Sequence, residues 1–158
     1  MRYTKAASRI ITLLSSDDPD FSSIVQQLSD DDYPTLNELV KHSAPHIATK
    51  ALICLGLLGS EKSLDGISFA AKSKNPVLRL TAAQALSEIK NINQLPGAIQ
   101  LIMALIVDED VGVRKFALRT IELSRMSDFK KKIDQMRCND PNEHVRKLSQ
   151  DVFGKLEG

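Results

Sequence analysis

The stretch DEDVGVRKFALRTI, residues 108–121, decides the fold. It opens with three acidic residues and continues as an amphipathic run in which Val113, Ala117 and Ile121 recur at intervals of four. Residues four apart lie on one face of an α-helix, so the run predicts a helix with a small residue on its packed face. Asp110 lies at the expected N-cap, where a carboxylate accepts hydrogen bonds from free backbone N–H groups.

The same columns recur three more times along the chain. The residues aligned with Val113 are spaced by 31, 35 and 32 residues, and they are Ile47, Leu78, Val113 and Val145. Four residues further on, the column holds only small side chains, which are Ala51, Ala82, Ala117 and Ser149. Eight residues after the anchor stand Leu55, Leu86, Ile121 and Phe153. A fixed period of this length is typical of a repeat protein built from helical units.

Caps and arginines complete the repeated pattern. The expected N-caps, three residues before the anchor, are Asn75, Asp110 and Asn142, and the arginines directly after the anchor are Arg79, Arg114 and Arg146. The first copy departs from the pattern, because Ala44 and Ala48 replace the cap and the arginine. We expect the arginines to reach the turn of a neighbouring repeat and so to form a ladder of charge-assisted hydrogen bonds, and direct contact with a ligand is the alternative.

Each anchored helix follows another apolar helix, and no strand pattern interrupts the series. The run LPGAIQLIMALIV, residues 95–107, is apolar nearly all round, which predicts a helix buried in the middle of an array. The sequence therefore predicts an all-α protein, an α-α superhelix of about five helix pairs. A single domain is expected over 1–158, with 36–158 forming four helix pairs and 1–35 forming two atypical capping helices.

These motifs resemble the HEAT repeat family, in particular its bacterial HEAT-like branch, which includes phycobilin lyases. Asp110, Val113, Arg114, Ala117 and Ile121 carry the resemblance, which covers roughly residues 36–156. It implies a curved solenoid whose second helices line the inner face, and an arginine ladder that is structural.

Composition narrows the function. The chain has 158 residues, 42% of them hydrophobic and 26% charged, a net charge of +1 and no Trp. This balance favours a soluble globular protein without a general attraction to nucleic acid or anionic membrane. The two cysteines, Cys54 and Cys138, lie in no ligand spacing, which favours a reducing cytoplasm. The N-terminal segment reads as a helix rather than a signal peptide, and no membrane contact is expected.

No set of residues predicts catalysis. His42 and His46 have the spacing of two ligands on a helix, but the intervening Ser-Ala-Pro predicts a helix break and no third ligand is near. Cys54 falls in a packing column, and Cys138 falls in a predicted loop without an activating histidine. We therefore expect a protein that is not an enzyme and has no catalytic residue, cofactor or metal.

The exposed face of the second helices is the predicted binding surface for another protein. Each helix contributes one large apolar residue to this face, bordered by polar or charged ones, and these large apolar residues either form a binding ridge or pack against the next repeat. The predicted partner-binding residues are Lys50, Ile53, Leu80, Gln84, Lys115, Phe116, Arg119, Lys147 and Leu148.

Two alternatives stay open. Residues 111–137 contain eight basic and three acidic residues, and this local excess of positive charge is what phosphate backbones attract. The second alternative is a lyase-type HEAT protein that handles a bilin or another tetrapyrrole. It follows only from the family resemblance, and the small number of aromatic residues argues against it.

Overall fold

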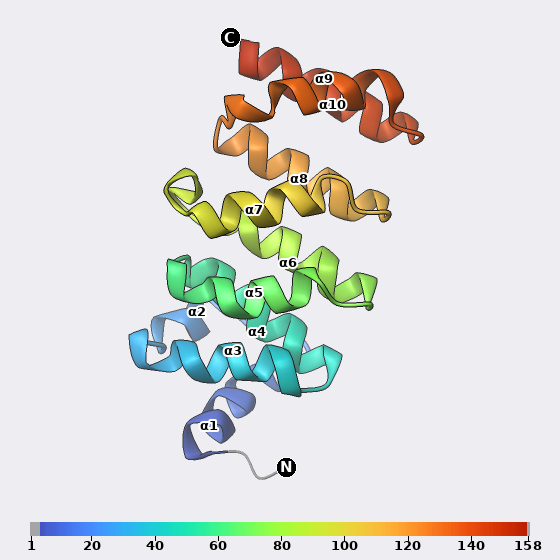
Figure 1. Ribbon diagram of the computed structural model, residues 1–158. Coiled ribbons are helices and arrows are strands. Elements are labelled where there is room, and N and C mark those ends of the chain that lie inside the picture. Colours follow the sequence, from blue (N-terminus) through green and yellow to red (C-terminus); the bar gives the residue numbers. More distant parts are fainter. Residues whose placement is uncertain (1–3, 158) are drawn as a thin grey trace. The chain divides into compact units, whose positions relative to one another are not determined.

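The computed structural model describes residues 4–157, and ten α-helices lie within that range (Figure 1). From residue 33 onward the helices pack as sequential pairs joined by short turns, which confirms the all-α, HEAT-like solenoid class. The chain forms two compact units, Met1–Lys90 and Asn91–Gly158. No helix in the described part of the chain is long and apolar enough to cross a membrane.

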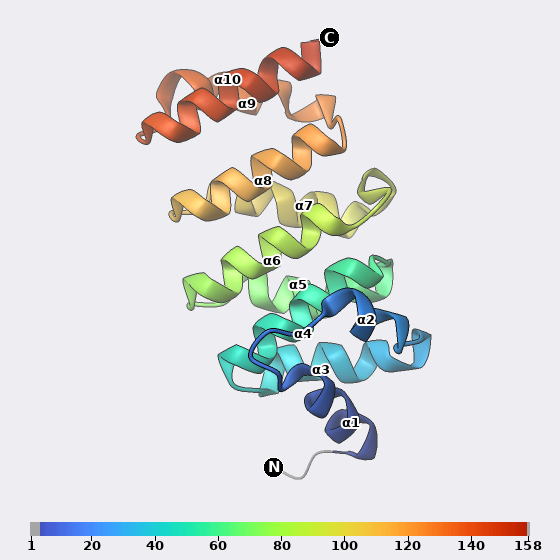
Figure 2. The same cartoon turned by 180° about the vertical axis from the view of Figure 1, so that it is seen from behind.

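The first unit contains six helices. Their bounds are α1 Lys5–Leu14, α2 Phe21–Gln26, α3 Tyr33–His42, α4 Pro45–Leu58, α5 Leu64–Ala71 and α6 Pro76–Glu88. Helix α3 pairs with α4, and α5 pairs with α6. The first helices of the two pairs also contact each other, as do the second helices, so α4 and α6 form one layer, seen in Figure 2, and α3 and α5 form the other.

Helices α1 and α2 pack against α3 and α4 rather than pairing with each other. Thr4 caps α1 by accepting a hydrogen bond from the N–H of Ala7, and Asp20 caps α2 in the same way. The C-terminal end of α1 is bound by Lys50 of α4. Its ammonium donates to the carbonyl oxygens of Leu14 at 2.9 Å and Ser16 at 2.7 Å, which places a cation at the negative end of the α1 dipole.

The second unit contains the last four helices. Their bounds are α7 Pro96–Leu105, α8 Val111–Leu123, α9 Lys130–Asn139 and α10 Glu143–Glu157. Helix α7 pairs with α8, α9 pairs with α10, and α8 contacts α10. The long second helices are therefore layered in this unit as they are in the first.

The repeated columns of the sequence form the cores of both units. Each anchor residue is buried, and the small residues four positions later are buried completely or nearly so. Small residues allow one close approach between two second helices. A Cβ atom added to Gly56 of α4 would lie 2.8 Å from the Cα of Ala85 in α6. Helices α4 and α6 therefore meet closely at Gly56 and Ala85.

Two local predictions are wrong. Helix α7 is not buried all round, because Met103 is 52% exposed and Val107, just beyond the helix, is 57% exposed. The paired helix covers one face of α7, and the opposite face reaches the surface. Cys138 lies inside α9 rather than in a loop, because that helix continues to Asn139 and ends where Asp140 becomes extended.

Candidate functional site

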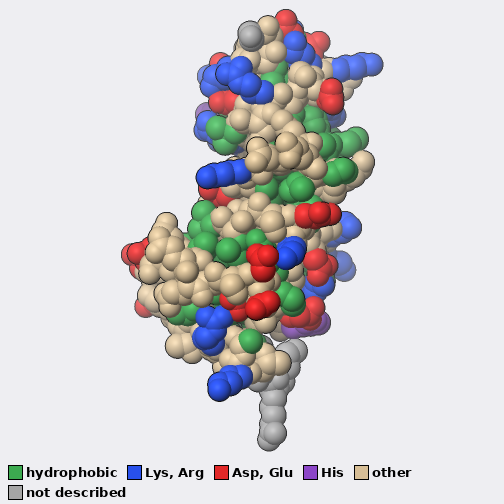
Figure 3. All heavy atoms as spheres, turned by 90° about the vertical axis from the view of Figure 1, so that its left-hand side faces the viewer, with side chains coloured by type: hydrophobic (Ala, Val, Ile, Leu, Met, Phe, Trp, Pro, Cys, Tyr) green, Lys and Arg blue, Asp and Glu red, His purple; other side chains and the backbone are tan. Residues whose placement is uncertain are grey.

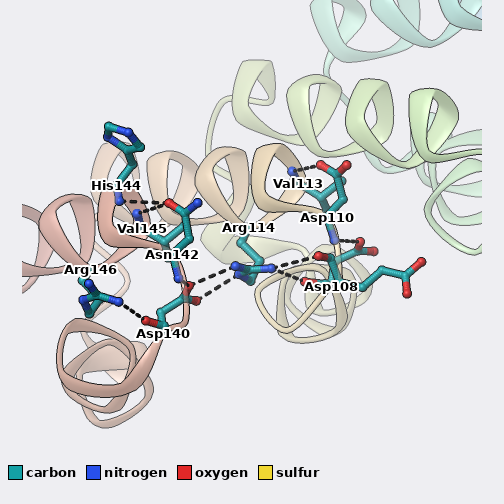
Figure 4. Close-up of polar contacts among 10 residues, drawn as sticks. Asp108, Asp110, Val113, Arg114, Asp140, Asn142, His144, Val145 and Arg146 are labelled. Carbon is teal, nitrogen blue, oxygen red and sulfur yellow. Dashed lines mark hydrogen bonds and ion pairs between the residues drawn. The ribbon is translucent and has the colours of Figure 1, made fainter.

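The predicted ladder residue Arg114 lies in a nearly closed polar network in the second unit (Figure 4). Its Nε and Nη2 donate to the two carboxylate oxygens of Asp140, each at 2.9 Å. Its Nη1 donates to the carbonyl oxygens of Asp108 at 2.9 Å and Glu109 at 3.1 Å. The side chains of Arg114 and Asp140 are only 10% and 5% exposed, so this bidentate ion pair joins two inter-helix turns away from water.

The other two arginines bond to backbone carbonyls of the turn directly before their own helix, whereas Arg114 also reaches the turn of the next repeat. Arg79 donates to the carbonyl of Ser73 at 3.0 Å, and Arg146 donates to the carbonyl of Asp140 at 2.7 Å. The side chains of the predicted caps Asn75, Asp110 and Asn142 all accept backbone N–H groups at the start of their helices. Ala44 has no such contact.

The predicted partner-binding residues differ in how accessible they are. The polar members Gln84, Lys115, Arg119 and Lys147 are exposed, and the four large apolar members Ile53, Leu80, Phe116 and Leu148 are half-buried. Lys50 is also half-buried, and its ammonium is already bonded to the carbonyls at the end of α1. Partner binding by this set stays a prediction.

Ion pairs reduce the free positive charge of the basic segment 111–137. Besides Arg114, Arg137 lies 2.6 Å from Asp134 and stacks over the ring of Phe153, and Lys130 lies 3.1 Å from Glu157. These pairings leave a smaller basic surface for a phosphate backbone than the sequence count suggests.

Sequence reasoning missed a surface groove between α7 and α9. The groove has a volume of about 430 Å³, and its apolar lining is formed by Ile99, Met103, Ile106, Val107 and Phe129. Asp128 and Lys132 are its charged lining residues. Figure 3 shows hydrophobic side chains at the surface at the height of α7, toward the right of the view. The apolar composition of residues 95–107 could have indicated this groove, because this segment has more apolar side chains than the core takes up and the remaining ones line the groove.

A more polar hollow of about 600 Å³ continues the α7–α9 groove. The two share Ile106, Val107 and Lys132, and the hollow ends at the buried pair of Arg114 with Asp140. Lys132 is half-buried and forms no ion pair within residues 4–157. A cationic side chain therefore lies at the junction of an apolar and a polar surface.

The thiols and histidines are dispersed over the molecule. Cys54 is fully buried, and burial raises the pKa of its thiol from 9.0 to about 12. His42 lies 3.1 Å from Glu38, while His46 and His144 are exposed at helix starts. Residues 4–157 contain no group of three or more His, Cys, Asp or Glu side chains that could hold a metal ion.

Comparison with known families agrees with this architecture. Residues 33–122 match the family described as HEAT repeats, which is more than half of the chain. The chain therefore belongs to the HEAT repeat family. No match to a curated protein was found.

A solved structure with a similar fold is a chain of the complex of CpcE and CpcF of phycocyanin lyase from Nostoc sp. PCC7120. The two chains superpose with a TM-score of 0.73 at 17% sequence identity. The alignment covers 93% of this chain and 97% of the other, so the likeness extends over nearly the whole of both. At this identity the likeness establishes a shared fold.

Proposed function

We propose that this chain is a HEAT-repeat protein with a role related to that of a phycocyanin lyase subunit, binding a protein partner and taking part in the handling of an open-chain tetrapyrrole. The observation that carries the proposal is the agreement in fold over 93% of this chain and 97% of a chain from the complex of CpcE and CpcF. That chain functions within an assembly of two proteins, which supports a protein partner for this one.

Tetrapyrrole handling is tested with biliverdin, an open-chain tetrapyrrole, added to the purified chain and to the chain with its captured partner. Binding restricts the rotation of the linked rings, so we expect a sharper and shifted visible band and increased fluorescence. Bovine serum albumin at equal concentration controls for nonspecific uptake. An unchanged spectrum under both conditions would refute tetrapyrrole handling.

The alternative of a non-catalytic scaffold is favoured by one feature of the second unit. Helices α8 and α10 contact each other, and each presents a half-buried apolar residue, Phe116 or Leu148, beside exposed basic ones. Apolar residues bordered by charged ones are typical of protein interfaces.

The face used is tested by affinity capture from the native cell extract, read by mass spectrometry. A double variant, Phe116→Asp with Leu148→Asp, is compared with the wild type after circular dichroism has confirmed its fold. Loss of a protein captured by the wild type would support binding through the second helices. Equal capture would exclude this face, and salt-sensitive recovery of nucleic acid alone would favour the basic segment instead.

A further inference from the structure

The α7 side of the α7–α9 groove is an apolar wall without a cover. Met103 and Val107 are four residues apart, and both are more than half exposed. Large apolar side chains that occur together at the surface and border a hollow mark a contact site more often than isolated ones do. Burying them would contribute about 25 cal/mol for each Å² of apolar surface removed from water.

The first unit has a hollow of about 470 Å³ at the corresponding place between α3 and α5, and five of its seven lining residues are polar or charged. Asn37, which follows the fully buried Leu36, donates to the carbonyl of Lys62 at 2.9 Å and accepts from the N–H of Gly66 at 2.7 Å. Gly66 allows this approach, because a Cβ there would lie 2.6 Å from Oδ1 of Asn37.

In the second unit, large side chains occupy the matching positions. On α7, Met103 follows the fully buried Ile102, which is the position that Asn37 has after Leu36. On α9, Lys132 precedes the fully buried Ile133, which is the position that Gly66 has before Ile67. Met103 has no side-chain amide group that could form the two hydrogen bonds of Asn37, and Lys132 carries the Cβ that Gly66 lacks where that close approach is made. The two hollows therefore differ in their lining, which is mainly polar and charged in the first unit and mainly apolar with one lysine in the second.

The charges around the two grooves also differ. In the first unit the lysines are neutralised within the protein, since Lys41 lies 2.6 Å from Asp65 and Lys62 lies 3.1 Å from Asp30. Lys132 has no such partner within residues 4–157. Asp128 lines the same groove but forms no ion pair with Lys132, so an anionic group of a ligand can still pair with the half-buried ammonium.

The shape fits a helix. The apolar residues on this side of the groove run from Ile99 in α7 to Val107 just beyond its end, which is about 12 Å or two helical turns at the usual rise per residue. The opposite wall is formed by residues between 128 and 139. Two turns of an amphipathic helix would place one apolar face on α7 and a polar edge toward α9.

We propose that the α7–α9 groove binds an amphipathic helix of a protein partner, with its apolar residues on Met103 and Val107 and an acidic side chain on Lys132. The inference rests on the proposed function in requiring a protein partner, and it adds where that partner binds and what its contact segment contains. A second copy of this chain and a small apolar carboxylate are the competing occupants.

The test uses a phage-displayed library of helical peptides selected on the full-length chain. Recovered peptides are synthesised with a fluorescein label and titrated by anisotropy against the wild type and three variants, Met103→Asp, Lys132→Glu and Lys131→Glu. Lys131 is the matched control, because it is the adjacent exposed lysine and lies outside the groove lining. Circular dichroism at 222 nm confirms that each variant is folded.

We expect the recovered peptides to share apolar residues one turn apart and a nearby acid. Met103→Asp should abolish binding, Lys132→Glu should raise the Kd about tenfold and Lys131→Glu should leave it unchanged. Replacing the acid of the peptide with lysine should restore binding to Lys132→Glu. Absence of helical peptides, recovery of peptides without an acid, or undiminished binding to Met103→Asp would each overturn the proposal.

Two further readouts separate this inference from the proposed function. If a native partner binds Met103→Asp as well as wild type, protein binding stands and the groove assignment is wrong. If wild type captures no protein and does not alter the biliverdin spectrum, the proposed function fails whatever the peptides do. Self-association that Met103→Asp abolishes, measured by sedimentation, would overturn the proposal in favour of a second copy.

Discussion

Replacing Asp140 with alanine should destabilise the second unit by about 3 kcal/mol, because it leaves the Arg114 guanidinium buried without its counterion. The variant loses the two hydrogen bonds of 2.9 Å to Arg114, between side chains that are 10% and 5% exposed, and it also removes the acceptor of the Asn142 N–H. Removing one member of a buried pair costs about 3–5 kcal/mol. The lower end applies here, since Arg114 retains its bonds to the carbonyls of Asp108 and Glu109.

Urea unfolding followed by circular dichroism at 222 nm measures this loss, and the double-mutant cycle with Arg114→Met isolates the pair. The double variant leaves no unpaired charge, so it should be at least 1 kcal/mol more stable than the two single losses predict when summed. Arg146→Met is the matched control. Arg146 donates to the backbone carbonyl of Asp140, so Asp140→Ala leaves this contact in place. We expect Arg146→Met to lower the free energy of unfolding by about 1 kcal/mol. A cost below about 1 kcal/mol for Asp140→Ala, or simple additivity in the cycle, would refute the reasoning.

Three other perturbations probe packing, capping and ionisation. Gly66→Ala should lower the free energy of unfolding by about 2 kcal/mol, because its Cβ would lie 2.6 Å from Oδ1 of Asn37. Gly154→Ala is the control, since no atom lies within 4 Å of the added Cβ, and thermal unfolding should show up to about 1 kcal/mol of stabilisation there. Equal losses at both sites would contradict the packing argument. Asp110→Ala should lower stability by about 1 kcal/mol, since the N–H of Val113 loses its acceptor, whereas a neutral result in chemical denaturation would show that water replaces the cap. The folded-state pKa of Cys54 is raised to about 12, so the thiol of the unfolded chain ionises first as the pH rises above 9. The free energy of unfolding should therefore fall by about 1 kcal/mol between pH 9 and 10, and Cys54→Ala should remove that part of the fall. An identical pH dependence in both proteins would argue against a buried neutral thiol.

The repeated columns predicted the fold well because they report a local property, the face that a helix buries. Val113, Ala117 and Ile121 are four residues apart, and all three are buried as that spacing predicts. The HEAT repeat family was recognised from the same positions, and the match over residues 33–122 confirms it.

Contacts between distant segments left no such pattern. Nothing around Lys50 indicates that its ammonium binds carbonyls 36 and 34 residues earlier. The apolar run 95–107 was expected to be covered on all sides. That expectation was wrong because a sequence shows how apolar a helix is but not how many neighbouring helices cover it. The α7–α9 groove follows from that difference, since Met103 and Val107 have more apolar surface than the fold can cover.

The arginine contacts bear on how such a protein grows in evolution. Arg79, Arg114 and Arg146 each donate to a carbonyl exactly six positions earlier in the chain, at 3.0, 2.9 and 2.7 Å. Each arginine and the turn to which it bonds are therefore encoded within one short segment of the gene. Duplication of a repeat copies both together, so a lengthened array inherits its turn geometry at once and has only the surfaces between helices left to adapt.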